Sequence, residues 1–489
     1  MLQKFPKMTR QRLFLLLIAL LLIALSWWGV AGARTGLVVR SRFADGVPLL
    51  YVVPQRQEKL PGVLVAHGFA GSKQLMLGYA HVLAHAGYAV MLWDFGGHGA
   101  NAAPLERFSL QQDLDVAYAA LLSQPEVDPT RLALLGHSMG SGAVMAAGIR
   151  NVDRFAATVA VSPTYGQVTP FAPRNLQLQV GSWESGFIAN AQRLLVAAGG
   201  ESQNLASGRG RSLVIVPNAE HITILFRNAS HQAALRWLDA TFGISHTSSY
   251  VDLRMLWYGL HLLAWLIVLG VVTPALALPA IAHKAIGLLR TWGGLLVAPL
   301  VASGVLTLLS RLGEIQSLGG LMVGGALGIW FLVAGLVWLS ILFHLPRPTI
   351  RAVGLGVAFF GLLWVAFGAM AQVVWLQWWL IPRRLLLWPL LSLACFPWFL
   401  ASGMAQQGAG VVRRLAWWLG QSTALVGGLF LVLYLLPQLS FIFLLLPLFP
   451  PLMAILSFAA AQLDEVWSYA LGSALFFGWM IAAAFPLAA

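Results

Sequence analysis

The sequence predicts two fold classes in one chain: an α/β unit, with a mostly parallel sheet covered by helices on both faces, and an all-α polytopic transmembrane domain. Of the 489 residues, 59% are hydrophobic and only 10% are charged, whereas a soluble domain carries about 25% charged residues. Short apolar strands alternate with helical patterns before residue 250, and long apolar runs follow it. We therefore expect a membrane anchor at 1–35, the α/β unit at 36–250 and about eight transmembrane helices at 251–489.

The first 35 residues have the pattern of an N-terminal membrane anchor. Four Lys and Arg residues lie within residues 4–12, and residues 13–30 are almost wholly apolar, a run long enough to cross a bilayer at about 1.5 Å per residue. Residues 31–33 also fit a signal-peptidase site, so a removed signal peptide is the alternative, although the apolar run is long for one. Either interpretation exports the segment that follows, and the positive charge predicts a cytoplasmic N-terminus.

Residues 36–250 contain the strand and helix patterns of an α/β sheet. A hairpin is expected across 40–53, turning at Asp45-Gly46. Further strands are predicted by apolar runs at 63–66, 89–93, 131–135, 156–161, 176–180 and 212–216. Helices are predicted at 75–86, 110–122 and 231–242. This alternation is what implies a mostly parallel sheet with helices on both faces.

Residues 251–489 have the composition of a membrane-embedded domain. Apolar spans are predicted near 255–282, 291–310, 318–343, 352–379, 385–401, 415–436, 438–460 and 466–486. Only four of the 17 acidic residues lie here, all at or near predicted span ends: Asp252, Glu314, Asp464 and Glu465. Ion-coupled transporters need buried carboxylates or histidines. His261, near the start of its span, is the main intramembrane candidate, but an interfacial position is the favoured interpretation, which disfavours a transport role.

The net charge of +13 is better explained by membrane topology than by a nucleic-acid partner. Loops on the predicted cytoplasmic side carry basic pairs: Lys284 and Arg290, Arg347 and Arg351, Arg413 and Arg414. This bias places the α/β unit outside the cytoplasm of a cell-membrane protein. The pair Arg383-Arg384, in a predicted outer loop, is the exception. The single cysteine, Cys395, excludes a disulfide within the chain.

One pentapeptide in the α/β unit indicates chemistry. Gly136-His137-Ser138-Met139-Gly140 reads G-x-S-x-G, follows the apolar run 131–135 and precedes the small-residue run 141–148. Strand, sharp turn and helix are the context in which this motif exposes the hydroxyl of a nucleophilic serine. The motif alone is also compatible with a glycine-rich turn that holds an incidental serine, so its partners decide the interpretation.

Two more loops follow predicted strands in the same order. His67-Gly68 comes after the strand at 63–66, and Asp94-Phe-Gly-Gly-His-Gly99 comes after the strand at 89–93. Together with the G-x-S-x-G turn, these loops make residues 36–245 resemble the α/β-hydrolase superfamily, in its compact serine-hydrolase branch. The resemblance implies a serine hydrolase with neither a metal nor an organic cofactor.

The resemblance also implies roles for five residues. Ser138 would be the nucleophile, and His221, in the loop after the last predicted strand, would be the general base. Glu184 stands where most members carry the aspartate that orients the base, and its extra methylene changes its reach. The backbone N–H groups of Phe69 and Met139 would form the oxyanion hole.

The segment 163–174 occupies the place where many relatives insert a cap domain. Because it is so short, we expect an open cleft. Tyr165 and Phe171 are candidates for lining the substrate pocket, and packing of their rings onto the sheet is the alternative. An open cleft beside a lipid bilayer suits an ester or lipid-like small molecule, or an exposed peptide.

The leading hypothesis is therefore a membrane-bound serine hydrolase with an extracytoplasmic catalytic domain, which cleaves an ester, in preference to an amide or a peptide, through an acyl-enzyme. An acyltransferase would use the same side chains with an acceptor alcohol in place of water. A third hypothesis makes the membrane domain a transporter or scaffold and the hydrolase fold a binding module. The complete set of Ser138, His221 and Glu184 argues against this third hypothesis.

Overall fold

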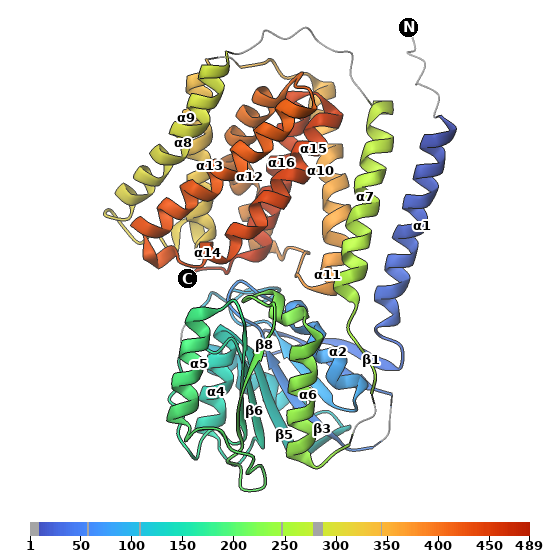
Figure 1. The fold of residues 1–489 in the computed structure, drawn as a ribbon, viewed down its shortest axis with the longest axis vertical. Coiled ribbons are helices and arrows are strands. Elements are labelled where there is room, and N and C mark those ends of the chain that lie inside the picture. The colour runs from blue at the N-terminus through green and yellow to red at the C-terminus, as the bar shows by residue number, and fades with distance from the viewer. Residues whose placement is uncertain (1–8, 56–57, 107–108, 246–247, 277–286, 344) are drawn as a thin grey trace. The chain divides into compact units, whose positions relative to one another are not determined.

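The structure is a computed structural model that describes residues 9–55, 58–106, 109–245, 248–276, 287–343 and 345–489 (Figure 1). The chain forms two compact units. The α/β unit contains Trp28–Tyr258 and two distant segments, Ala371–Trp379 and Pro486–Ala489. The helical unit contains the described residues up to Trp27, with Gly259–Met370 and Leu380–Phe485. The α/β unit therefore extends beyond the predicted range 36–250 by two segments from the C-terminal half.

The α/β unit is built around one sheet. Its strands are β1 (Leu37–Ala44), β2 (Val47–Pro54), β3 (Leu60–Ala66), β4 (Ala89–Trp93), β5 (Val127–His137), β6 (Ala157–Val161), β7 (Leu176–Gly181) and β8 (Arg211–Val216). Among the described residues the strand order is β1-β2-β4-β3-β5-β6-β7-β8. The pairs β1–β2 and β2–β4 are antiparallel and the other pairs are parallel. This is the sheet of the α/β-hydrolase fold, so the predicted fold class is confirmed.

Helices cover both faces of this sheet (Figure 1). They are α2 (Leu77–His85), α3 (Ser109–Leu122), α4 (Met139–Arg150), α5 (Ser185–Ala197) and α6 (Asn228–Phe242). Val63 and Val65 of β3 pack in the same core cluster as α2 and α6. Leu64, between them, packs with α3 and α4 on the opposite face, because successive side chains of a strand point to opposite faces.

Local sequence explains one element of the unit and fails for another. The hairpin of β1 and β2 turns as predicted at Asp45 and Gly46, whose φ angles of +46° and +79° are those that a two-residue turn requires. Helix α5 (Ser185–Ala197) was not predicted from the sequence. It is stabilised by tertiary packing, with Ala191 and Leu194 buried in the core beside β7.

Nine helices of the described residues are long and apolar enough to cross a membrane, so the chain is a multi-pass membrane protein. In chain order these spans are α1 (Arg10–Gly32), α7 (Arg254–Leu276), α8 (Leu288–Leu309), α9 (Gly324–Leu342), α10 with α11 (Ile350–Val374), α12 (Pro382–Gln406), α13 (Val411–Leu435), α14 with α15 (Ile442–Leu463) and α16 (Val466–Ala484). The number equals the eight predicted spans plus the anchor. The predicted span 352–379 ends early, at Val374, and residues 277–282 lie outside the described residues.

Arg384 explains the exception to the predicted charge bias. Its side chain is buried in the helical unit, with 1% of the residue exposed. Its Nη1 donates hydrogen bonds to the carbonyl oxygens of Ala482 and, at 2.7 Å, Phe485. These carbonyls lie at the end of α16, where a helix leaves its last acceptors without partners. The guanidinium of Arg384 therefore caps the C-terminal end of α16.

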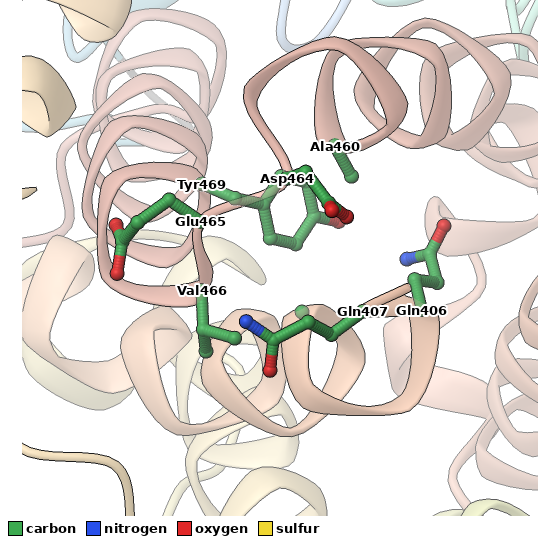
Figure 2. Close-up of a pocket in the computed structure, with 8 residues that line it drawn as sticks. Gln406, Gln407, Ala460, Asp464, Glu465, Val466 and Tyr469 are labelled. Atoms are coloured by element: carbon green, nitrogen blue, oxygen red, sulfur yellow. The ribbon is translucent and has the colours of Figure 1, made fainter. Parts of the chain in front are cut away.

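A small polar pocket lies in the helical unit where α12, α15 and α16 end or begin (Figure 2). Its walls include two glutamines and two carboxylates: Gln406, Gln407, Asp464 and Glu465. Glu465 accepts a hydrogen bond from the N–H of Trp467 (3.2 Å) and so caps α16, and Asp464 pairs with Arg414 (3.1 Å). The carboxylates here are engaged in helix capping and ion pairing, and the pocket contains none of the predicted site residues.

Candidate active site

Ser138 lies on a strained turn between β5 and α4. Its φ of +52° and ψ of −119° are unusual for a residue with a side chain. Its N–H donates to the carbonyl of Val161 (2.9 Å), which ties the turn to β6. A Cβ at Gly136 would lie 2.3 Å from the carbonyl oxygen of Gly140, so this sharp turn requires glycine. The geometry matches the strand-to-helix elbow that the motif predicts.

His221 lies against this serine. It follows β8, and its Nε2 is 3.0 Å from Ser138 Oγ. His137 contacts the backbone of His221, since the Nε2 of His137 is 2.9 Å from the carbonyl oxygen of His221. Burial, with the nearby His221 as a second cause, lowers the pKa of His137 well below its usual value. The neutral His137 ring therefore donates its Nε2–H to that carbonyl, and it holds the loop of His221 in place.

Glu184 completes the line of polar groups. It follows β7 and precedes α5, and its Oε1 is 2.7 Å from His221 Nδ1. Its Oε2 accepts hydrogen bonds from the N–H of Gly181 (2.6 Å) and from Ser162 Oγ (2.9 Å). Glu184 is buried, with 6% of the residue exposed. The extra methylene of glutamate is thus accommodated by anchoring the far oxygen to the end of β7.

Two residues at this site were not singled out from the sequence. Ser162 follows β6 and hydrogen bonds to Glu184, and the Phe187 ring lies 4.4 Å from the His221 ring, centroid to centroid. Ser162 carried one usable signal, because it directly follows a predicted strand of a parallel sheet. The carboxyl ends of such strands meet at one edge of the sheet. Phe187 lies on the helix that the sequence did not predict.

The loop of Phe69 passes beside the serine. A Cβ at Gly68 would lie 2.9 Å from His137 Nδ1 and 3.1 Å from the Cβ of Ser138, so a larger residue here would displace these groups. Met139 begins α4, and the first N–H groups of a helix have no carbonyl partner within the helix. Both predicted oxyanion donors therefore belong to backbone that adjoins Ser138, while their role stays a prediction.

The two aromatic residues of the short cap segment are exposed. Tyr165 is 77% exposed and Phe171 is 63% exposed. The guanidinium of Arg209 lies 4.7 Å from the centroid of the Phe171 ring. Neither ring is buried against the sheet, which removes the packing alternative, and pocket lining stays a prediction.

Among the residues that the structure describes, no group of three or more His, Cys, Asp and Glu side chains is arranged to hold a metal ion.

The fold and these loops define a hydrolase of the α/β class, and sequence comparison agrees. Residues 57–236 match the model of the family described as serine aminopeptidase, S33. This segment of the chain therefore belongs to the α/β-hydrolases, which confirms the resemblance drawn from its motifs. The match ends before α7 and does not reach the spans of the C-terminal half.

Individual relatives match shorter stretches. An uncharacterised protein of Mycobacterium tuberculosis is 36% identical over 103 residues, which cover 21% of this chain and 36% of that protein. The quorum-quenching protein AidA of Acinetobacter baumannii is 28% identical over 117 residues, 22% of this chain and 38% of AidA. The chain thus spans little more than a third of the length of these relatives.

Solved structures resemble a part of the chain. A membrane phospholipase A, described as a bacterial virulence factor, is 17% identical with a TM-score of 0.35, over 47% of this chain and 99% of that one. Esterase Est22 is 18% identical with a TM-score of 0.33, over 43% of this chain and 82% of that one.

Proposed function

We propose that this chain is a membrane-bound serine hydrolase that cleaves an ester bond through an acyl-enzyme. Ser138 is the nucleophile, His221 the general base and acid, and Glu184 the carboxylate that orients the imidazole. The observation that carries the proposal is the unbroken line from Ser138 Oγ to His221 Nε2 (3.0 Å) and from His221 Nδ1 to Glu184 Oε1 (2.7 Å). Nucleophile, base and orienting carboxylate in hydrogen-bond contact are what activates a serine.

In the proposed mechanism, His221 Nε2 removes the proton of Ser138 Oγ as the oxygen attacks the carbonyl carbon of the ester. Glu184 accepts the Nδ1–H hydrogen bond and stabilises the imidazolium that forms. The N–H groups of Phe69 and Met139 stabilise the oxyanion. Nε2 then gives its proton to the departing alcohol, and water, activated by the same histidine, hydrolyses the acyl-Ser138 ester and restores the free serine.

The membrane placement is part of the proposal. The basic residues before the first span put the α/β unit outside the cytoplasm. The single cysteine, Cys395, is buried, so a Cys395→Ala background with Asn204→Cys would carry one exposed thiol in the α/β unit. We expect a membrane-impermeant maleimide to label this thiol in intact cells. Labelling only after lysis would place the unit in the cytoplasm.

Labelling with a fluorophosphonate probe tests the nucleophile directly. We expect the wild type to react and Ser138→Ala to be silent, while Ser123→Ala, at an exposed serine of the same unit, reacts like the wild type. A reactive Ser138→Ala would refute the assignment.

A panel of p-nitrophenyl esters of graded chain length, beside amino-acid anilides, then defines the substrate. The family description names an aminopeptidase, so anilide turnover above ester turnover would replace the ester proposal by a peptidase.

A further inference from the structure

Two short segments from the C-terminal half of the chain belong to the α/β unit: Ala371–Trp379 and Pro486–Ala489. The site described above uses neither of them. Residues 375–379 follow the fifth span and residues 486–489 follow the ninth, just as the α/β unit follows the first. Each of these spans is odd-numbered. If every span crosses, all three parts of the chain lie on the same side of a membrane, whichever side that is.

Gln377 joins the first segment to the loop that follows Gly71. Its side-chain oxygen accepts a hydrogen bond from Gln74 Nε2 (2.6 Å), and its backbone N–H donates to Ser72 Oγ (3.2 Å). All three residues are buried. Buried hydrogen bonds of this kind fix geometry strongly, because no water is present to replace a lost partner.

Gln377 is itself held in a defined turn. The Oε1 atom of Gln372 accepts hydrogen bonds from the N–H groups of Trp378 (2.6 Å) and Trp379 (3.1 Å). The Nε2 atom of Gln372 donates to the side-chain oxygen of Gln377 (3.2 Å). Trp375 packs against the hydrophobic core between the sheet and α2. The segment therefore presents Gln377 from a turn with little freedom to move.

The loop that Gln377 holds is the loop that carries Phe69. The N–H of Gly71 donates to the carbonyl of Gly68 (3.1 Å), which closes a tight turn around Phe69. Gly68 in turn lies against Ser138, as described above. A shift of Ser72 and Gln74 would therefore move the Phe69 N–H relative to the serine.

The C-terminal segment holds the neighbouring loop. The N–H of Leu487 donates to the carbonyl of Gly97 (2.8 Å), and the carbonyl of Leu487 accepts from the N–H of Leu105 (2.9 Å). The two loops are joined to each other, because the N–H of Lys73 donates to Asp94 Oδ1 (2.7 Å) and its ammonium pairs with Oδ2. Both segments thus act on one connected pair of loops beside the site.

We infer that Gln377 is a positioning residue for the proposed reaction, and that the catalytic unit is complete only with the segments Ala371–Trp379 and Pro486–Ala489 in place. The inference rests on the proposed function, since Gln377 acts by placing the Phe69 N–H over the oxyanion formed at Ser138. An oxyanion donor acts mainly in the transition state. Its displacement therefore slows the chemical step and leaves ground-state binding nearly unchanged.

The test measures kinact and KI for a fluorophosphonate probe on the full-length protein in detergent. Gln377→Ala is expected to lower kinact about tenfold and to leave KI within about twofold of the wild type. Gln377→Ala also removes the hydrogen bond from Gln377 Nε2 to the carbonyl oxygen of Trp379 (3.0 Å), a bond that Gln74→Ala leaves in place. Gln316, whose Nε2 donates to the carbonyl of Gln438 (3.0 Å) in the helical unit, is the matched control, and Gln316→Ala should change neither constant.

A second variant and a second readout separate positioning from a general loss of structure. Gln74→Ala breaks the same hydrogen bond from the other side, so it should lower kinact as Gln377→Ala does, and the double variant should lose little more. Hydrogen exchange over residues 68–76 should be faster in Gln377→Ala than in the wild type. An unchanged kinact, unchanged exchange, or a loss in the double variant as large as the two single losses together would overturn the inference.

The outcomes also distinguish this inference from the proposed function. If the wild type does not react with the probe, the proposed function fails and the inference fails with it. If the wild type reacts, Ser138→Ala does not, and Gln377→Ala reacts at the wild-type rate, only the inference fails.

Discussion

Polar side chains form different kinds of hydrogen bond at the candidate active site of the α/β unit and at the helix ends of the helical unit. In the α/β unit, Glu184 and His221 meet Ser138 at the ends of three strands, and their hydrogen bonds join side chains to one another. In the helical unit, Arg384 and Glu465 form hydrogen bonds to the backbone at helix ends. A bilayer offers no water to unpaired backbone groups, so Arg384 and Glu465 supply partners that the ends of α16 would otherwise lack. Substitutions should therefore change rate in the first unit and stability in the second.

The largest effect is expected from Glu184→Gln. The amide cannot stabilise the imidazolium of His221 and favours the wrong tautomer, so kcat should fall by about 10³ to 10⁴. The measurement is kcat for a p-nitrophenyl ester, with thermal unfolding of the same samples to check that the unit remains folded.

Glu220→Gln is the matched control for this experiment. Glu220 adjoins His221 in the chain, but its carboxylate accepts hydrogen bonds from the N–H groups of Ile222 and Thr223. We expect kcat within about threefold of the wild type, since the carboxylate of Glu220 hydrogen bonds to backbone N–H groups and glutamine keeps one of these two acceptors. Equal losses in the two variants would contradict the assigned role of Glu184.

The helical unit offers its own matched pair, Arg384→Leu and Arg311→Leu. Arg384 is buried on the carbonyls of α16, whereas Arg311 is exposed. Because hydrogen bonds to charged groups contribute about 1.5 to 3 kcal/mol each, Arg384→Leu should destabilise the helical unit by about 3 kcal/mol, and Arg311→Leu should have little effect. Thermal unfolding in detergent measures both. Equal stability of the two variants would show that Arg384 does not close α16.

A smaller effect is expected from pH, because the α/β unit contains buried histidines whose protonation destabilises the fold. Burial lowers the pKa of His67, of His137 and of His81, the last to about 3. These rings are neutral when folded but are protonated in the unfolded chain below about pH 6.5. Their stabilisation is therefore fully present above pH 6.5 and is lost as the pH falls toward each folded pKa. For His81 the loss between pH 7.5 and 5.0 should be about 2 kcal/mol.

Unfolding midpoints measured at pH 7.5 and 5.0 test this expectation. His81→Gln removes one titrating group. The free energy of unfolding should therefore differ between pH 7.5 and pH 5.0 by about 2 kcal/mol less in this variant than in the wild type. A variant with the same pH dependence as the wild type would mean that His81 is not held neutral in the folded unit.

The sequence predicts those residues of the site that directly follow a predicted strand. Ser138, Glu184 and His221 each follow a predicted strand, and a parallel sheet brings such ends to one edge, but their roles were assigned from the resemblance to the α/β-hydrolases. Gln377 could not be predicted, because it lies 303 residues from Gln74 and no pattern relates two single glutamines. Its position depends on how the spans return the chain to the α/β unit.

The smallest loss of kcat in the α/β unit is expected from Ser162→Ala. Ser162 donates to Glu184 Oε2, which also accepts from the N–H of Gly181, so the carboxylate keeps one anchor when the hydroxyl is removed. The loss should be near the value of one hydrogen bond, about 1 kcal/mol or fivefold in kcat. Because Ser162 acts through Glu184, its removal should cost almost nothing further in a Glu184→Gln background. Additive losses would show that Ser162 acts on the reaction by another route.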